Sequence, residues 1–239
     1  MPGAASATAG RHVLNQKADG YTLFFGSEAM SVWQTMGINK ELNPYEDFYP
    51  VKLVAEATPV LAVPPNSEFE SAEEFVEYAQ ANPGELRIGG AKAVTAVMGG
   101  QVDATIEMVQ SMVEANKAGK LNILATFTNE PLTGLENIPT FGDQFPDLQE
   151  YLPYGPYFGL FARKDLPQDV KDTLEEAMSA AVDTQRWDDY CEKFFLTQID
   201  YSGEEAVQYL KDWTSRAAWV LYSTGAAKNS PADFGIPRP

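Results

Sequence analysis

Three observations predict an α/β fold. Apolar strand-like runs alternate with helix-like segments along most of the 239 residues. The apolar fraction of 44%, with 18 Gly and 16 Pro in no fixed period, is typical of a chain that folds around a core. The length lies between one and two domains of about 150 residues each, so it fits two lobes as well as one. We expect α/β layers with a mainly parallel sheet.

The first 65 residues predict a strand, a loop and a helix, followed by two more strands. Residues 21–25 form an apolar run that ends at Gly26-Ser27, and residues 28–36 carry apolar side chains at helical spacing up to Gly37. Two further β-type runs cover residues 52–57 and 59–63. They predict strands where the chain leaves one layer and enters another.

The middle of the chain repeats the alternation. Ser71 and Glu74 have the spacing of a capping box, which predicts a helix start, and Asn82-Pro83-Gly84 predicts its end. The same period rules predict strands at residues 86–88, 102–106 and 121–127, and helices at residues 91–98 and 109–118.

The last third begins with an irregular segment, residues 131–153, that is rich in Pro, Gly and Asn. An apolar strand is expected at residues 157–162, followed by helices at residues 165–182, 187–195 and 202–220. Ser202-Gly203-Glu204-Glu205 has the pattern of a second capping box, and the tail from Thr224 is turn-rich.

The charge balance excludes one class of partner. With 17 Lys and Arg against 34 Asp and Glu, the formal net charge is −17, and such a field repels phosphate backbones. We expect no nucleic acid partner. Because the acidic residues are spread over the whole chain, they are interpreted first as a solvated surface.

The residues that commonly carry catalysis or metals are scarce. His12 stands alone without a G-x-S-x-G motif, which argues against Ser-His-Asp catalysis. Cys191 cannot form an intramolecular disulfide or a cysteine-based zinc site and is expected in the core. Glycine loops of nucleotide-binding spacing are missing too. We expect no metal, no cofactor and no catalytic residue.

The same scan gives expectations about membrane insertion and cellular targeting. No run reaches the roughly 18 apolar residues of a membrane span, so we expect no direct membrane insertion. The N-terminus lacks the charged and apolar regions of a signal peptide.

One pattern that suits anion binding recurs. A strand ends in small residues before a helix at Gly26-Ser27 and again at Gly89-Gly90, and main-chain amides at such a place suit a carboxylate.

A series of short motifs resembles, in order, the receptors of tripartite tricarboxylate transporters, the Bug or TctC-like proteins. The motifs are Pro2-Gly3-Ala4-Ala5, Ala18-Asp19-Gly20-Tyr21-Thr22-Leu23, Pro59-Val60-Leu61-Ala62-Val63, Asn82-Pro83-Gly84-Glu85-Leu86, Gly99-Gly100-Gln101-Val102-Asp103, Gly119-Lys120-Leu121, Ile138-Pro139-Thr140, Gly159-Leu160-Phe161-Ala162 and Gly235-Ile236-Pro237. Each is weak alone, but their shared order over nearly the whole chain is specific.

Two departures from the family pattern concern its ligand loops. Family members begin with a further strand and a glycine-rich loop before the Pro-Gly-Ala element. They also have a long loop, a helix and a turn where this chain joins Gly90 directly to Ala91. Either residues are omitted from the chain at both places, or the protein is a shortened relative with an impaired pocket.

The resemblance implies a two-lobed type II periplasmic-binding-protein fold, with two mixed sheets flanked by helices and a ligand cleft at the hinge. Residues 1–60 and 157–239 would form lobe 1, and residues 61–156 lobe 2. It also implies a periplasmic monomer that binds a small carboxylate, either a di- or tricarboxylate or an aromatic acid. The monomer delivers this ligand to membrane permease subunits and performs no catalysis.

On the matching motifs, we expect six ligand-binding residues. Main-chain amides and hydroxyls would bind the anion through Ser27, Gly89, Gly90, Thr105, Tyr154 and Gly155. Each also has a purely structural interpretation: an N-cap for Ser27, a turn for the glycine pair, a β-former for Thr105 and a packed aromatic ring for Tyr154.

Two other functions stay open at this point. The chain is compatible with an enzyme that acts on a carboxylic acid through Asp103 or Glu107, although no placed base or metal cluster supports it. It is also compatible with a ligand-free sensor or partner-binding relative that lost its pocket with the missing segments.

Overall fold

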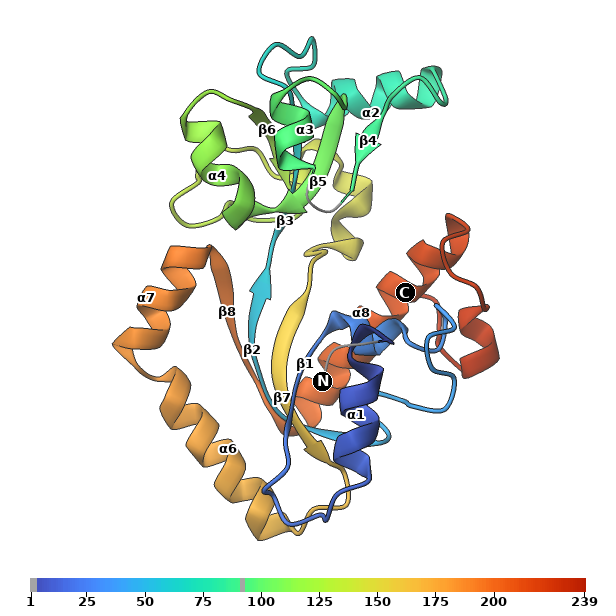
Figure 1. Ribbon diagram of the computed structural model, residues 1–239, viewed down its shortest axis with the longest axis vertical. Coiled ribbons are helices and arrows are strands. Elements are labelled where there is room, and N and C mark those ends of the chain that lie inside the picture. Colours follow the sequence, from blue (N-terminus) through green and yellow to red (C-terminus); the bar gives the residue numbers. More distant parts are fainter. Residues whose placement is uncertain (1–3, 91–92) are drawn as a thin grey trace. The chain divides into compact units, whose positions relative to one another are not determined.

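The computed structural model describes residues 4–90 and 93–239, and the chain divides into two compact units (Figure 1). Unit 1 consists of Met1–Glu56, Pro156–Tyr190 and Gln198–Pro239, and unit 2 of Ala57–Gly155 and Cys191–Thr197. The segment 191–197 therefore belongs to unit 2, whereas the division made from the sequence includes it in lobe 1. The assignment of the units to receptor lobes stays a prediction.

Unit 1 is built on a four-stranded sheet in the order β1-β7-β2-β8. Its strands are β1 (Phe24–Ser27), β2 (Phe48–Ala57), β7 (Tyr157–Arg163) and β8 (Leu196–Tyr201). Strand β7 runs antiparallel to both β1 and β2. The helices that lie wholly or partly in unit 1 are η1 (Ala4–Ser6), α1 (Ala7–Leu14), η2 (Glu28–Val32), α6 (Gln168–Val182), α7 (Gln185–Phe194), α8 (Gly203–Ser223) and η4 (Pro231–Phe234). The end of α7 and the start of β8 fall in the segment 191–197 of unit 2.

An aromatic cluster forms the core on one side of this sheet. The rings of Phe24, Trp33, Phe48 and Phe161 contact one another with centroids 5.9–6.4 Å apart. Trp33 is fully buried, and its indole N–H donates to the Ala5 carbonyl at 2.7 Å. This bond satisfies the one polar atom of a buried indole.

Unit 2 has a second four-stranded sheet, in the order β4-β5-β3-β6. Its strands are β3 (Pro59–Val63), β4 (Ile88–Gly89), β5 (Ala104–Met108) and β6 (Asn122–Thr126). Its helices are α2 (Ala72–Ala81), α3 (Val94–Met98), α4 (Val109–Lys117), α5 (Phe141–Gln144) and η3 (Pro146–Tyr151).

The burial of strand β3 explains the unbroken apolar run at residues 59–63. All five of its residues are buried, because helices cover both faces of the sheet. Val60 and Ala62 pack in a cluster with side chains of α3 and α4, whereas Leu61 and Val63 pack with side chains of α2. A strand covered on both faces has no polar alternation to show in its sequence.

The predicted α/β fold with two sheets flanked by helices is confirmed, and the sheet of unit 2 is mixed, but the expectation of a mainly parallel sheet is wrong. Among the pairings between described strands, β1–β7, β2–β7, β3–β5 and β3–β6 are antiparallel, and β4–β5 is parallel. The chain leaves unit 1 along β2 and returns along β7, so these two neighbours must run in opposite directions. Strand–helix alternation in the sequence does not reveal such a return.

Several local expectations also need correction. Helix α1 and strand β8 form where no element was expected, and α5 with η3 lie within the segment 131–153, which was expected to be irregular. Residues 28–36 form a short 3₁₀ helix, η2, followed by turns instead of a longer helix. Strand β1 includes Gly26 and Ser27, which were expected to end it. The start of the helix expected at residues 91–98 lies outside the described residues.

The two predicted capping boxes behave differently. The Ser71 hydroxyl accepts from the Glu74 amide at 3.1 Å, while the Glu74 carboxylate accepts from the Glu70 amide at 2.8 Å. Ser202 caps α8 in extended conformation without a side-chain hydrogen bond, and Gly203 follows with φ 54°. The cap at Ser71 is therefore confirmed, although the Glu74 carboxylate reaches the amide of Glu70 instead of that of Ser71, and the second box is not formed.

We expect Ser71→Ala to lower the free energy of unfolding by about 1 kcal/mol, because a first-turn amide of α2 loses its acceptor. Ser202→Ala is the matched control, since the Ser202 side chain makes no capping hydrogen bond and should change the stability less. Urea denaturation followed by circular dichroism measures both. Equal losses in the two variants would contradict the assignment of the cap.

Candidate functional site

The candidate site of unit 1 lies where β1 ends. Ser27 is the last residue of β1, opposite Phe158 of β7, and its backbone is extended with φ −138°. The neighbouring Gly26 has no room for a Cβ, which would come within 3.0 Å of the Met30 sulfur and the Phe161 ring. This crowding against the aromatic core fixes the chain at Ser27.

Glu28 follows directly and directs its side chain back to Ser27. Burial raises the pKa of Glu28, and the nearby Ser27 hydroxyl and main-chain N–H groups of Glu28 and Ala29 oppose the shift only in part. A carboxylate of the chain itself thus lies beside Ser27.

A buried hydroxyl pair connects η2 to β7. The Ser31 and Tyr157 hydroxyls are 2.7 Å apart, and the two residues are 126 positions apart in the chain. Tyr157 is fully buried, and its ring meets those of Tyr209 and Trp213 edge to face. Burial raises the pKa of Tyr157, so its hydroxyl stays protonated.

A second carboxyl group lies beside the rings of Tyr157 and Tyr209. The Tyr209 hydroxyl donates to Glu56 near the end of β2. Burial raises the pKa of Glu56, against the hydrogen bond from Tyr209 and the positive charge of Arg216. Burial and the Glu56 charge raise the pKa of Tyr209. Unit 1 therefore contains two carboxyl groups whose ionisation is disfavoured, each next to tyrosine hydroxyls.

In unit 2, three of the expected residues lie together on β4 and β5. Thr105 is fully buried opposite Gly89, and its hydroxyl donates to the Gly89 carbonyl at 3.1 Å. A Cβ on Gly89 would collide with the Ala93 side chain, whereas Gly90 is exposed and has free space around it. Since the Thr105 proton is used within the sheet, this hydroxyl can offer a ligand only acceptor capacity.

Tyr154 and Gly155 lie together at the start of β3. The Tyr154 amide donates to the Phe127 carbonyl at 3.2 Å. A Cβ on Gly155 would overlap the Ala57 carbonyl oxygen, so the residue is a glycine because the chain passes close to that backbone. Of the six expected site residues, the five in unit 2 thus form two groups, and Ser27 lies in unit 1. Their contact with a ligand stays a prediction.

The side chains considered for an enzyme are in other roles. The Asp103 carboxylate forms a two-pronged ion pair with the Arg87 guanidinium at 2.9 and 3.1 Å, and its hydrogen bonds with Arg87 lower the pKa of Asp103. A lowered pKa makes a poor general acid or base near neutral pH. Glu107 lies opposite Val60 in the β3–β5 ladder.

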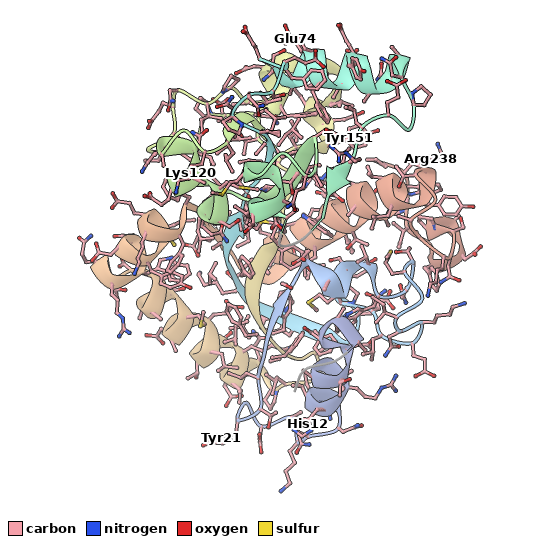
Figure 2. All side chains as sticks on the ribbon, turned by 45° about the horizontal axis from the view of Figure 1, so that its top comes forward. His12, Tyr21, Glu74, Lys120, Tyr151 and Arg238 are labelled. Carbon is pink, nitrogen blue, oxygen red and sulfur yellow. The ribbon has the colours of Figure 1, made fainter. Side chains whose placement is uncertain are left out.

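The residue types that commonly carry catalysis or metals lie apart in the part of the chain that the structure describes. No group of three or more His, Cys, Asp or Glu side chains is placed there to hold a metal ion. His12 is exposed on α1, as Figure 2 shows, and Cys191 is buried as expected. None of the described helices is both long and apolar enough to cross a membrane.

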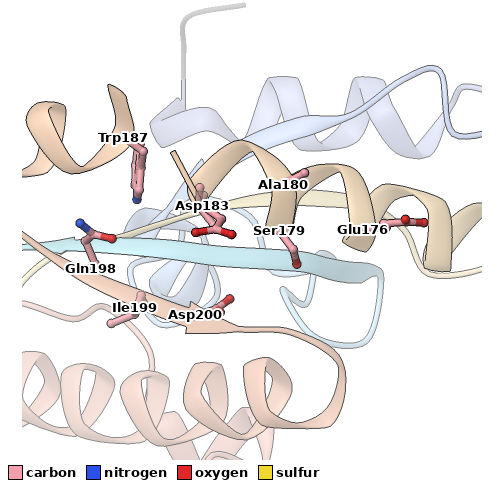
Figure 3. Close-up of a pocket in the computed structure, with 9 residues that line it drawn as sticks. Glu176, Ser179, Ala180, Asp183, Trp187, Gln198, Ile199 and Asp200 are labelled. Carbon is pink, nitrogen blue, oxygen red and sulfur yellow. The ribbon is translucent and has the colours of Figure 1, made fainter. Parts of the chain in front are cut away.

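Two grooves lie outside the candidate site. One, in unit 1, has a volume of about 570 Å³ (Figure 3). It is lined by Glu176, Ser179, Ala180, Val182, Asp183, Trp187, Gln198, Ile199 and Asp200. The other, in unit 2, has about 520 Å³ and is lined by Pro64, Asn66, Ser67, Glu68, Phe69, Tyr78, Glu85, Leu86, Gly100 and Asp103. Each contains three carboxylates, which repel an anionic ligand.

Sequence reasoning missed the polar cluster of unit 1, which consists of Glu28, Ser31, Glu56, Tyr157 and Tyr209. Glu28 is adjacent to the predicted Ser27 but was interpreted only as part of a helix. Ser31, Tyr157 and Tyr209 come from three distant segments, and no local pattern connects them. The one available signal was Glu28 itself, an acidic residue directly after a predicted anion-binding serine.

Comparison with known families shows which family the chain belongs to. The family model of the tripartite tricarboxylate transporter family receptor, TctC, matches residues 1–90 and 87–225. The chain belongs to this receptor family. The two matched stretches overlap at residues 87–90, the place where the sequence suggested a missing family segment. One relative, Protein BugT of Bordetella pertussis, is 24% identical over 87% of this chain and 73% of its own.

Solved structures support the same fold. A ligand-free TctC solute-binding protein from Polaromonas has a TM-score of 0.77 at 20% identity, over 93% of this chain and 85% of its own. MatC of Rhodopseudomonas palustris with bound malate has a TM-score of 0.72 at 20% identity, over 92% and 86%. Rpa4515 of R. palustris with adipate has a TM-score of 0.72 at 20% identity, over 94% and 85%. The family and the fold are those of solute-binding receptors, which are not enzymes.

We expect the Ser31–Tyr157 pair to show energetic coupling. Tyr157→Phe leaves a buried serine hydroxyl without its partner, which should cost about 1–3 kcal/mol of stability. Adding Ser31→Ala removes that orphaned group, so the double variant should be more stable than the sum of the single losses indicates. A double-mutant cycle by chemical denaturation measures the coupling. Strict additivity would show that the hydroxyls do not interact.

Proposed function

We propose that this TctC receptor captures a small carboxylate in the periplasm and presents it to membrane permease subunits of its transporter. The observation that carries the proposal is membership of the receptor family, together with proteins of the same fold solved with malate and with adipate. Those ligands are small dicarboxylates, and we extend that class to this chain. Tricarboxylates and aromatic acids belong to the same proposal.

The proposed ligand contacts are Ser27 in unit 1 and Gly89, Gly90, Thr105, Tyr154 and Gly155 in unit 2. Ser27 would donate its hydroxyl, Thr105 would turn its hydroxyl from the Gly89 carbonyl to the ligand, and Gly90 would offer its exposed main-chain N–H. The net charge of −17 does not exclude an anion, because hydrogen-bond donors act at contact distance. Distant surface charge is screened beyond about 8–10 Å at physiological salt.

The proposal also covers the oligomeric state, the cofactors and the other partners of the protein. We propose a monomer that acts without a metal or organic cofactor, does not insert into the membrane and has no nucleic acid partner. The acidic surface supports the last point, since it disfavours a polyphosphate. The permease subunits would recognise the folded receptor rather than the free ligand.

One observation favours a second candidate, a relative that has lost ligand binding and retains a sensing or partner-binding role. The family match is split into two stretches that meet at residues 87–90, next to the proposed donors Gly89 and Gly90. A segment missing at that point would remove ligand contacts. Ligand binding by the chain distinguishes the two candidates.

We expect a cognate carboxylate to raise the melting temperature. A ligand at 100 times its Kd stabilises the native state by about 2.7 kcal/mol. For a chain of this size that amounts to about 5–11 °C. Differential scanning fluorimetry with malate, adipate, citrate and benzoate tests the class of ligand. A flat response to the whole panel would favour the second candidate.

The role of Ser27 is tested by comparing two serine variants of unit 1. We expect Ser27→Ala to weaken binding of the cognate carboxylate about tenfold, the effect of losing roughly one charge-assisted hydrogen bond. Ser223→Ala, an exposed position on α8, is the control and should bind like the unaltered protein. Isothermal titration calorimetry gives both affinities. Unchanged binding in Ser27→Ala would remove Ser27 from the site.

A further inference from the structure

The chain passes between unit 1 and unit 2 at four points. The unit 1 residues at these points are Glu56, Pro156, Tyr190 and Gln198. Strands β2, β7 and β8 lie at three of the points, and they are neighbours in one sheet, with β2 between β7 and β8 (Figure 1). Any movement of one unit against the other must change the backbone at these points, because the chain connects the units there.

One side chain of α8 contacts all three of these strands. The Tyr209 hydroxyl donates to the carboxylate of Glu56, the residue at which β2 leaves unit 1. The Tyr209 ring meets the ring of Tyr157, the first residue of β7, edge to face with centroids 5.8 Å apart. The same ring packs against that of Tyr201, the last residue of β8, with centroids 5.1 Å apart. Tyr209 therefore links the three strands close to where the chain passes between the units.

The contacts of Tyr209 depend on one another. Glu56 and Tyr157 are register partners in the β2–β7 ladder, so Tyr209 reaches two residues that lie side by side. Tyr157 is fully buried, and its own hydroxyl is 2.7 Å from that of Ser31. The carboxylate of Glu56 is half-buried, and a carboxylate withdrawn from water needs hydrogen-bond donors. Loosening one strand should therefore disturb its neighbours.

We infer that Tyr209 is a positioning residue for carboxylate capture, because it anchors three strands that connect the units. The inference rests on the proposed function, in which Ser27 of unit 1 and a second group of donors in unit 2 bind one carboxylate. A receptor with loose connections samples more arrangements when it is free, so it loses more entropy when a ligand holds both units. Loss of the anchor should weaken ligand binding although no proposed ligand contact is removed.

The first experiment measures the anchor in the ligand-free protein by amide hydrogen exchange with mass spectrometry. Tyr209→Phe removes the hydroxyl that bonds Glu56 and keeps the ring. Peptides from residues 53–57 and 157–160 should exchange about tenfold faster, the effect of roughly one lost hydrogen bond to a carboxylate. Peptides from β1, in the same sheet, should keep their rate, whereas a general loss of stability would speed their exchange as well.

The second experiment measures the affinity for malate, adipate, citrate and benzoate by isothermal titration calorimetry. Tyr209→Phe should bind the acids that the unaltered protein binds about fivefold more weakly, a coupling of ordinary size. Glu56→Leu should show a similar loss, because it removes the acceptor of the same hydrogen bond. Glu56→Gln should lose less than Glu56→Leu, since its amide oxygen can still accept from the Tyr209 hydroxyl.

Two controls separate positioning from stability. Tyr222→Phe removes the hydroxyl of an exposed tyrosine on the same helix and should change neither the exchange nor the affinity. Ser71→Ala lowers the stability through the cap of α2 and should leave the affinity unchanged. Circular dichroism shows whether each variant is folded. If Tyr209→Phe is not, Tyr201→Leu replaces it, and exchange should then rise in β8.

Four results would overturn the inference. Unchanged exchange in the peptides of β2 and β7 would show that Tyr209 does not anchor these strands. Faster exchange with unchanged affinity would separate the anchor from capture and leave the proposed function standing. An equal loss of affinity in Ser71→Ala would show that stability, not positioning, sets the affinity. If the unaltered protein binds none of the four acids, the proposed function fails and the positioning role fails with it.

Discussion

The structure of unit 1 depends on the position of β7 between β1 and β2. Strand β1 has only four residues, and its register with β7 places Ser27 opposite Phe158. A Cβ on Gly159 would meet the Leu53 side chain and the Lys52 carbonyl oxygen within 3 Å, so β7 fits between its neighbours only with a glycine there. Tyr157, the first residue of the same strand, reaches Ser31. One strand thus positions both ends of the polar cluster.

That cluster shows how an acidic chain buries carboxyl groups. Glu28 and Glu56 are each withdrawn from water, with Ser27 and main-chain N–H groups near Glu28, and with the Tyr209 hydroxyl and the positive charge of Arg216 at Glu56. Such donors stabilise a carboxylate without fixing it as an anion, so the group can still take up a proton. In contrast, Asp103 is held by the Arg87 guanidinium and stays ionised. The two environments shift the pKa of a carboxyl group in opposite directions.

Much of the fold was predictable because local sequence carries it. The apolar runs of β2 and β3 and the cap at Ser71 show directly in the residues. Strand β8 was missed because its six residues include none that is buried, so it has no apolar alternation, and pairing with β2 makes it a strand. Helix α1 was missed because Gly10 interrupts it; a Cβ there would come within 3.0 Å of the Trp33 ring.

The candidate site was predictable only in part. Ser27 and the Gly89-Gly90 turn follow from the rule that strands end in small residues before helices. The use of the Thr105 hydroxyl within the sheet depends on strand register, and the Ser31–Tyr157 pair depends on a contact across 126 positions. Neither can be inferred from local spacing. The position of the Glu28 carboxylate depends on the side-chain rotamer of Glu28, and sequence patterns do not encode rotamers.

Helix α6 illustrates a different kind of attachment. It has no fully buried residue, and polar contacts join it to β2: the Lys52 ammonium donates to the Ser179 hydroxyl at 3.0 Å, and Tyr49 donates to Glu175. Lys52 itself is buried and pairs with Asp200 of β8. Val170, Leu174 and Met178 of α6 also pack against the buried residues Val51, Ala162 and Leu166. Because the apolar side chains of α6 are only partly buried, its amides should exchange with solvent deuterium before those of β7.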